Sequence, residues 1–117
     1  MLVVEDEDAV RELTGRILSE SGYEVMHAAD GYRAQAICDE HDGAIHLLLS
    51  DLVMPGMSGR EVAEALRAAR PEIKVLYMSG HSGDVLTHDA APGDQTPMIE
   101  KPFDRRGLLR SVRSALA

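Results

Sequence analysis

Six polar residues could do chemistry together, because each lies at the end of an apolar run: Glu5, Asp6, Glu7, Asp51, Ser79 and Lys101. Carboxylates brought together raise one another's proton affinity unless a cation lies among them. An all-oxygen site of this kind suits a hard divalent ion, and Mg²⁺ is usually bound through few carboxylates together with water and a phosphate. Lys101 would add a fixed positive charge and Ser79 a hydroxyl donor, and both suit phosphoryl oxygens.

Asp51 is the candidate nucleophile of such a site. The sequence offers no Ser–His pair, and its one cysteine, Cys38, lies on the apolar face of a predicted helix and is expected in the core. The five histidines have no metal-ligand spacing. A carboxylate can attack a phosphoryl donor and form an acyl phosphate. The residue types therefore favour an aspartate as the reacting group.

Apolar runs and helical spacings alternate along the chain. The runs predict strands at residues 2–4, 23–27, 45–51, 73–78 and 97–100. Helical spacing of apolar residues follows at 10–18, 30–41, 58–69 and 108–116, and a short or frayed fourth helix fits at 84–90. Ser58 and Glu61 form a capping box that starts the third helix.

The alternation predicts an α/β fold with a five-stranded parallel sheet and five helices. The strands are continuously apolar, which is typical of parallel strands covered by helices on both faces. Right-handed crossovers in a chain of this length favour the flavodoxin-like three-layer sandwich with strand order 2-1-3-4-5. In that order the first and third strands are neighbours, so Asp6 and Asp51 come together at the carboxyl ends of the strands, where ligands bind.

Length and charge limit the classes of function. The 117 residues fit one domain, 1–117, and the apolar strand directly after Met1 suggests a domain excised from a longer protein. The net charge of −8 argues against direct nucleic-acid binding. One cysteine and the lack of a long apolar run predict a cytoplasmic domain without disulfides or membrane contact, even where the parent protein is membrane-anchored.

Four sequence blocks, each at the end of a predicted strand, resemble the receiver domains of two-component response regulators: residues 2–7, 51–59, 78–80 and 101–103. The resemblance covers essentially the whole chain. It implies that Asp51 accepts a phosphoryl group from a phosphohistidine, and that Ser79 and Lys101 bind the phosphoryl oxygens. It also implies a cis Lys101–Pro102 peptide bond.

The same resemblance implies Mg²⁺ as the cofactor. Asp6, with Glu5 beside it, would hold the ion together with Asp51 and the main-chain carbonyl of Val53. The implied partner is a sensor histidine kinase or a histidine phosphotransfer protein. A receiver promotes its own phosphorylation and dephosphorylation without being a turnover enzyme, although the parent chain can itself be a histidine kinase.

Residues 55–59 and 78–83 look most like receivers attached to hybrid sensor histidine kinases, which favours a phosphorelay module. One departure from the family is Met98, where many receivers carry an aromatic switch ring three residues before the lysine. By resemblance, Val53 and His81 control water access to the acyl phosphate, and neither suits the orientation of a water. Slow self-hydrolysis is therefore expected.

Other functions share parts of this pattern. A stand-alone response regulator acting as an output switch would use the same residues, whereas a degenerate receiver that only binds partners would lack some of them. A metal-dependent phosphohydrolase would need a second acid two residues after Asp51, where the chain has Val53. A flavin-binding module of this fold would need a phosphate loop after the first strand, where this chain has acids.

Overall fold

The computed structural model describes residues 1–80 and 96–117. Its strands are β1 (Leu2–Val4), β2 (Met26–Ala28), β3 (Leu47–Asp51), β4 (Lys74–Ser79) and β5 (Met98–Glu100). Its helices are α1 (Asp8–Glu20), α2 (Gly31–Glu40), α3 (Gly59–Ala69) and α5 (Arg105–Leu116). The fourth helix predicted at 84–90 lies outside the described residues. No helix in the described ranges combines the length and apolar character needed to cross a membrane.

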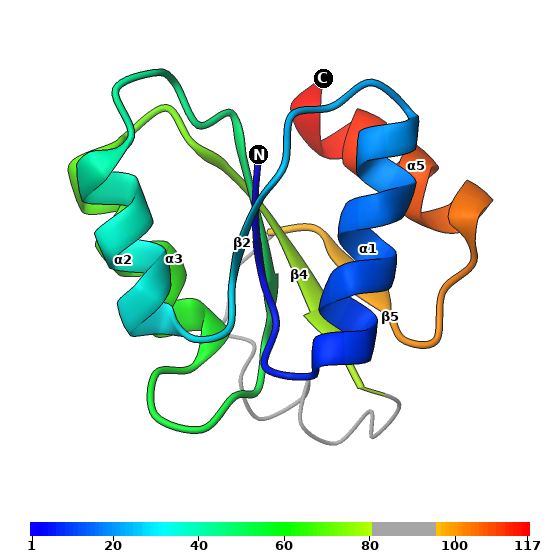
Figure 1. The fold of residues 1–117 in the computed structure, drawn as a ribbon, viewed down its shortest axis with the longest axis horizontal. Helices are drawn as coiled ribbons and strands as arrows, with labels where there is room; N and C mark the ends of the chain where they lie inside the picture. The colour runs from blue at the N-terminus through cyan, green and yellow to red at the C-terminus, as the bar shows by residue number, and fades with distance from the viewer. Residues whose placement is uncertain (81–95) are drawn as a thin grey trace.

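The five strands form one parallel sheet in the order β2-β1-β3-β4-β5, which confirms the predicted flavodoxin-like topology. In its register, Val4 pairs with Ser50 and Asp51 pairs with Met78. The residues after β1 and the end of β3 therefore meet at one edge of the sheet. Both chain termini lie at the opposite edge, as Figure 1 shows.

Helices cover both faces of the sheet, with α2 and α3 on one side and α1 and α5 on the other (Figure 1). Successive residues of a strand point to opposite faces. In β4, Val75 and Tyr77 accordingly enter the core under α2 and α3, while Leu76 and Met78 enter the core under α1 and α5. Cys38 packs in the first of these cores, as predicted.

The start of α3 packs directly on the backbone of β3. The predicted capping box is present, since Ser58 Oγ accepts from the amide of Glu61 and the Glu61 carboxylate accepts from the amide of Ser58. The amide of Gly59 donates to the Leu52 carbonyl at 2.8 Å. A Cβ at Gly59 would lie 2.3 Å from the Asp51 carbonyl oxygen, so only glycine allows this approach.

Arg70, just beyond α3, joins this helix to the end of α2. Its guanidinium donates to the carbonyl oxygens of Cys38, His41 and Gly43 at 3.0, 2.6 and 2.7 Å, and also to the Cys38 sulfur at 3.2 Å. Carbonyls at a helix C-terminus have no partner within the helix. One cationic side chain therefore caps α2 and ties it to the neighbouring helix.

We expect Arg70→Met to lower the free energy of unfolding by about 2 kcal/mol, because it leaves several carbonyls without a charged donor. Urea denaturation would measure the change. Arg16→Met is the matched control, since Arg16 is exposed on α1 and should alter stability little. Equal stability of the two variants would contradict the capping role of Arg70.

Candidate functional site

Main-chain hydrogen bonds extend the sheet past its strand ends and place the polar residues there. The amide of Glu5 donates to the Ala28 carbonyl at 3.1 Å. The amide of Leu52, which follows Asp51, donates to the Met78 carbonyl at 2.8 Å, and the amide of Lys101 donates to the Ser79 carbonyl at 2.7 Å. The residues that follow the strands are thus fixed by the sheet rather than by a loop.

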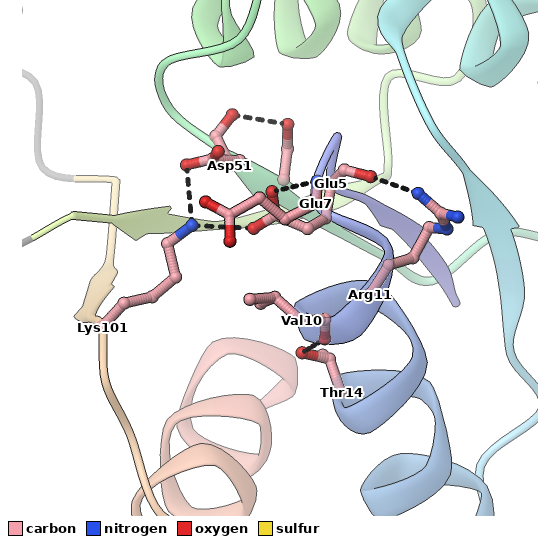
Figure 2. Close-up of polar contacts among 8 residues, drawn as sticks. Glu5, Glu7, Val10, Arg11, Thr14, Asp51 and Lys101 are labelled. Atoms are coloured by element: carbon pink, nitrogen blue, oxygen red, sulfur yellow. Dashed lines mark hydrogen bonds and ion pairs between the residues drawn. The ribbon is translucent and has the colours of Figure 1, made fainter.

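Lys101 bridges two carboxylates at this edge (Figure 2). Its Nζ lies 2.8 Å from Glu5 Oε1 and 3.5 Å from Asp51 Oδ1. The Glu5 side chain is fully buried, and the side chains of Asp51 and Lys101 are 8% and 15% exposed. Buried charges are costly unless they are paired, and this ammonium pairs with both carboxylates. The predicted convergence of Asp51 and Lys101 is present.

The carboxylates also form a cluster that could hold a metal ion. Glu5, Asp6 and Asp51 each offer a carboxylate oxygen, and these oxygens lie within 4.8 Å of one another. Asp6 is exposed, whereas the other two residues are buried. Three hard oxygen donors, one of them open to solvent, fit a divalent ion such as Mg²⁺ that keeps part of its water shell.

Ser79 supplies a second sign of a ligand. The residue is only 3% exposed, and within the described part of the chain its Oγ has no hydrogen-bond partner. A buried hydroxyl without a partner carries a desolvation cost, which native structures usually avoid. The hydroxyl belongs to the last residue of β4, the strand beside β3 and Asp51. It is available to an acceptor oxygen bound at this edge.

Burial perturbs both acids. Removal from water raises the pKa of Glu5 to about 7, although the hydrogen bond from Lys101 opposes the rise. Burial likewise raises the pKa of Asp51 against the attraction of Lys101. For Lys101 itself burial lowers the pKa, but the Glu5 hydrogen bond and the Asp51 charge outweigh burial, so the net shift is upward. The site therefore has a charged lysine beside two acids that ionise reluctantly.

A cavity of about 400 Å³ opens beside the site. It is bounded by the first half of α1 and by the segment after β5, and its lining residues are Glu7, Val10, Leu13, Gly80, Lys101, Pro102 and Phe103. Leu13 is 52% exposed although it is a large apolar residue. The peptide bond between Lys101 and Pro102 is cis, as the sequence predicted.

The remaining predicted residues are less enclosed. Val53 lies two residues past Asp51 with its side chain 55% exposed, and Met98 on β5 is 39% exposed. Met98 therefore does not fill the core in this conformation. His81 lies outside the described residues.

Sequence reasoning did not single out Arg11. Its Nη1 donates to the Glu5 carbonyl oxygen at 2.8 Å (Figure 2). Its Nη2 pairs with the Asp8 carboxylate. The only sequence signal is the spacing of Asp8 and Arg11, which places them on one helical face. That spacing is common on solvated helices, so it did not point to the site.

The sequence matches the family model for the response regulator receiver domain over residues 1–113. The chain belongs to this family. The receiver domain is 36% identical over 116 residues to sensor kinase CckA of Brucella abortus (strain 2308). The matched segment covers 99% of this chain and 12% of that kinase. Against the response regulator receiver protein CpdR of the same organism it is 29% identical, over 99% of this chain and 95% of CpdR.

Solved structures agree with the fold. The receiver domain from hybrid histidine kinase CckA superposes with a TM-score of 0.81 at 35% sequence identity, covering 99% of this chain and 97% of that one. The chain thus spans a small part of the sensor kinase but nearly all of CpdR. It is a receiver domain of two-component signalling, similar both to a receiver within a sensor kinase and to a response regulator receiver protein.

We expect the stability of the metal-free receiver domain to fall as pH rises from about 4.5 to about 7, the ordinary and the folded-state pKa of Glu5. The folded protein holds a proton on Glu5 that the unfolded chain releases in this window. The contribution of Glu5 to the free energy of unfolding is fully present below pH 4.5 and is lost as pH rises through about 7. Asp51, whose pKa is also raised, adds to the same trend.

Urea denaturation in EDTA at several pH values measures this dependence. Glu5→Gln should flatten the fall in stability across the window, because the amide cannot ionise. Glu64→Gln, a change of an exposed acid on α3, should leave it as in the wild type. An unchanged slope in Glu5→Gln would contradict the assignment to Glu5.

Proposed function

We propose that this receiver domain takes a phosphoryl group from a phosphohistidine onto Asp51. A carboxylate oxygen of Asp51 attacks the phosphorus, so a P–O bond forms as the P–N bond to the imidazole breaks. The electron pair of the broken bond stays on the imidazole nitrogen, which takes up a proton. The product is an aspartyl phosphate, a mixed anhydride that can be passed on or hydrolysed.

One observation carries this proposal: an acceptor carboxylate, a lysine ammonium and two further acids converge at one sheet edge. Asp51 Oδ1 lies 3.5 Å from Lys101 Nζ, and oxygens of Glu5 and Asp6 lie within 4.8 Å of an Asp51 oxygen. Lys101 can neutralise charge on a phosphoryl oxygen. The hydroxyl of Ser79, which has no hydrogen-bond partner among residues 1–80 and 96–117, can donate to another.

We assign Mg²⁺ to the carboxylates of Glu5, Asp6 and Asp51, with the main-chain carbonyl of Val53 as a further ligand by family resemblance. When bound, Mg²⁺ supplies positive charge that offsets the repulsion between the carboxylates and the phosphoryl oxygens. In this assignment Glu5 has two roles. Its Oε1 already accepts from Lys101, so Glu5 orients the lysine as well as contributing charge.

Asp51→Asn should abolish labelling of the domain by acetyl phosphate, because an amide is too weak a nucleophile to attack phosphorus. Intact-protein mass spectrometry in the presence of Mg²⁺ would detect the added phosphoryl group. Asp39→Asn, a change of an exposed aspartate on α2, should be labelled like the wild type. Labelling should also fail in the wild type when EDTA removes divalent metal. Undiminished labelling of Asp51→Asn would move the acceptor elsewhere.

The partner we propose is a kinase or phosphotransfer protein that presents its phosphohistidine on a helix. The cavity between α1 and the segment after β5 opens beside Lys101, and Leu13 gives it an exposed apolar rim. A helix that lays an apolar face here would bring a histidine toward Asp51. Burial of an exposed apolar side chain against a partner contributes favourable free energy to association.

A relay is the favoured setting for this transfer. The matching receivers of CckA belong to a kinase, and the chain carries Met98 where an aromatic switch ring is common in the family. Val53 also lacks a group able to orient a water next to Asp51, which favours a long-lived acyl phosphate. The match to nearly all of CpdR favours the alternative, a stand-alone regulator. The relay would be supported if the aspartyl phosphate decays slowly and the phosphorylated domain stays monomeric.

Leu13→Ala should slow phosphoryl transfer from a phosphorylated histidine phosphotransfer protein by about tenfold, because it removes apolar contact from the docking cavity. Labelling by acetyl phosphate should stay unchanged, since this small donor needs no docking surface. Tyr32→Ala is the matched control, because Tyr32 is 65% exposed and does not line the cavity. Equal losses with both donors would mean that Leu13 acts on the site itself.

A further inference from the structure

Arg11 holds the turn that carries the acidic residues. The turn, residues 5–7, joins β1 to α1 and consists of three acids, and a fourth acid, Asp8, begins the helix. The guanidinium of Arg11 reaches back from the first turn of α1 to the Glu5 carbonyl oxygen at 2.8 Å, and it also pairs with Asp8. The Arg11 side chain is 17% exposed, whereas Asp8 is 81% exposed. Arg11 is therefore packed against the turn rather than extended into solvent (Figure 2).

With Arg11 in place, every polar group of Glu5 has a partner. Its amide donates to the Ala28 carbonyl, and its carbonyl accepts from Arg11. Its Oε1 accepts from Lys101 at 2.8 Å, and its Oε2 accepts from the amide of Glu7 at 3.1 Å. Among the residues that the structure describes, the hydrogen bond from Arg11 is the contact that ties the main chain of Glu5 to the helix. If this hydrogen bond were lost, Glu5 would still be held within the turn by the Glu7 amide, which donates to its side chain.

We propose that Arg11 is a positioning residue for the Mg²⁺ site. By fixing the Glu5 carbonyl and Asp8, it sets the path of the main chain from β1 into α1, and thereby the positions of the Glu5 and Asp6 carboxylates. In this role Arg11 would act through the main chain that carries Glu5 and Asp6, without itself serving as a ligand of the metal or the phosphoryl group. The inference rests on the proposed function, because it presumes that these carboxylates bind Mg²⁺.

Charge and positioning predict opposite results for the loss of Arg11. A cation close to a metal site repels the metal, so its removal by charge alone strengthens Mg²⁺ binding. Loss of a group that orients a ligand weakens binding, typically by at least tenfold. The sign of the change in affinity therefore separates the two effects. A merely structural role would alter stability without a selective change in affinity.

Isothermal titration with MgCl₂ on the full chain, without any phosphodonor, provides the first measurement. Arg11→Met should weaken Mg²⁺ binding by about tenfold. Arg11→Lys keeps the charge but lacks the planar fork that reaches two acceptors, so it should restore binding only in part. Arg16→Met, an exposed arginine on the same helix, should bind like the wild type. Unchanged or tighter binding by Arg11→Met would overturn the proposal.

Amide hydrogen exchange in EDTA provides a second measurement that needs no metal. Arg11→Met should speed exchange of the Glu7 amide, which donates to Glu5, by about tenfold relative to the Leu49 amide in the central strand. The ratio removes any effect of global stability. If the wild type binds no Mg²⁺, the metal assignment fails, and the Glu7 exchange alone decides the positioning role. An unchanged ratio would then refute it.

Discussion

The pairing of Lys101 with Glu5 and Asp51 is the interaction on which the site depends. Carboxylate oxygens of these two acids lie within 4.8 Å of each other and are nearly removed from solvent. The two charges would repel each other, and the lysine between them offsets that repulsion. Burial still raises the pKa of both acids, so removal from water outweighs the attraction of the lysine. When both acids are ionised, two carboxylates face one ammonium, and the exposed carboxylate of Asp6 lies beside them. The proposed binding of a divalent cation and of a phosphoryl group would therefore draw on the same set of charges.

The parallel sheet makes this crowding unavoidable. Its strands all end at one edge, and the register places the end of β1 beside β3 and the end of β4 beside β5. Main-chain hydrogen bonds continue past the strand ends, which leaves the side chains little freedom to move apart. Gly59 adds a further restraint, because α3 begins in van der Waals contact with the carbonyl of Asp51. The fold therefore opposes the electrostatic relaxation that a flexible loop would allow.

The sequence was sufficient to predict features that follow from strand order and local chemistry. Asp51 and Lys101 could be placed together because the ends of parallel strands converge, and the capping box of α3 is a local signal. The second strand was predicted at 23–27 but spans Met26–Ala28. Tyr23 and Val25 are apolar because they pack against the core beside α1 and α5, and only three residues pair with the short β1.

The contacts of long cationic side chains could not be predicted in this way. Arg11 and Arg70 act through main-chain carbonyls brought near by the tertiary structure, and nothing in their sequence neighbourhood distinguishes them from solvated arginines. The position of the termini has a different kind of consequence. Both lie at the edge of the sheet opposite the acidic residues (Figure 1). Polypeptide attached at either end would leave the acidic edge open, so such a module can be joined to other domains in either order without covering these residues.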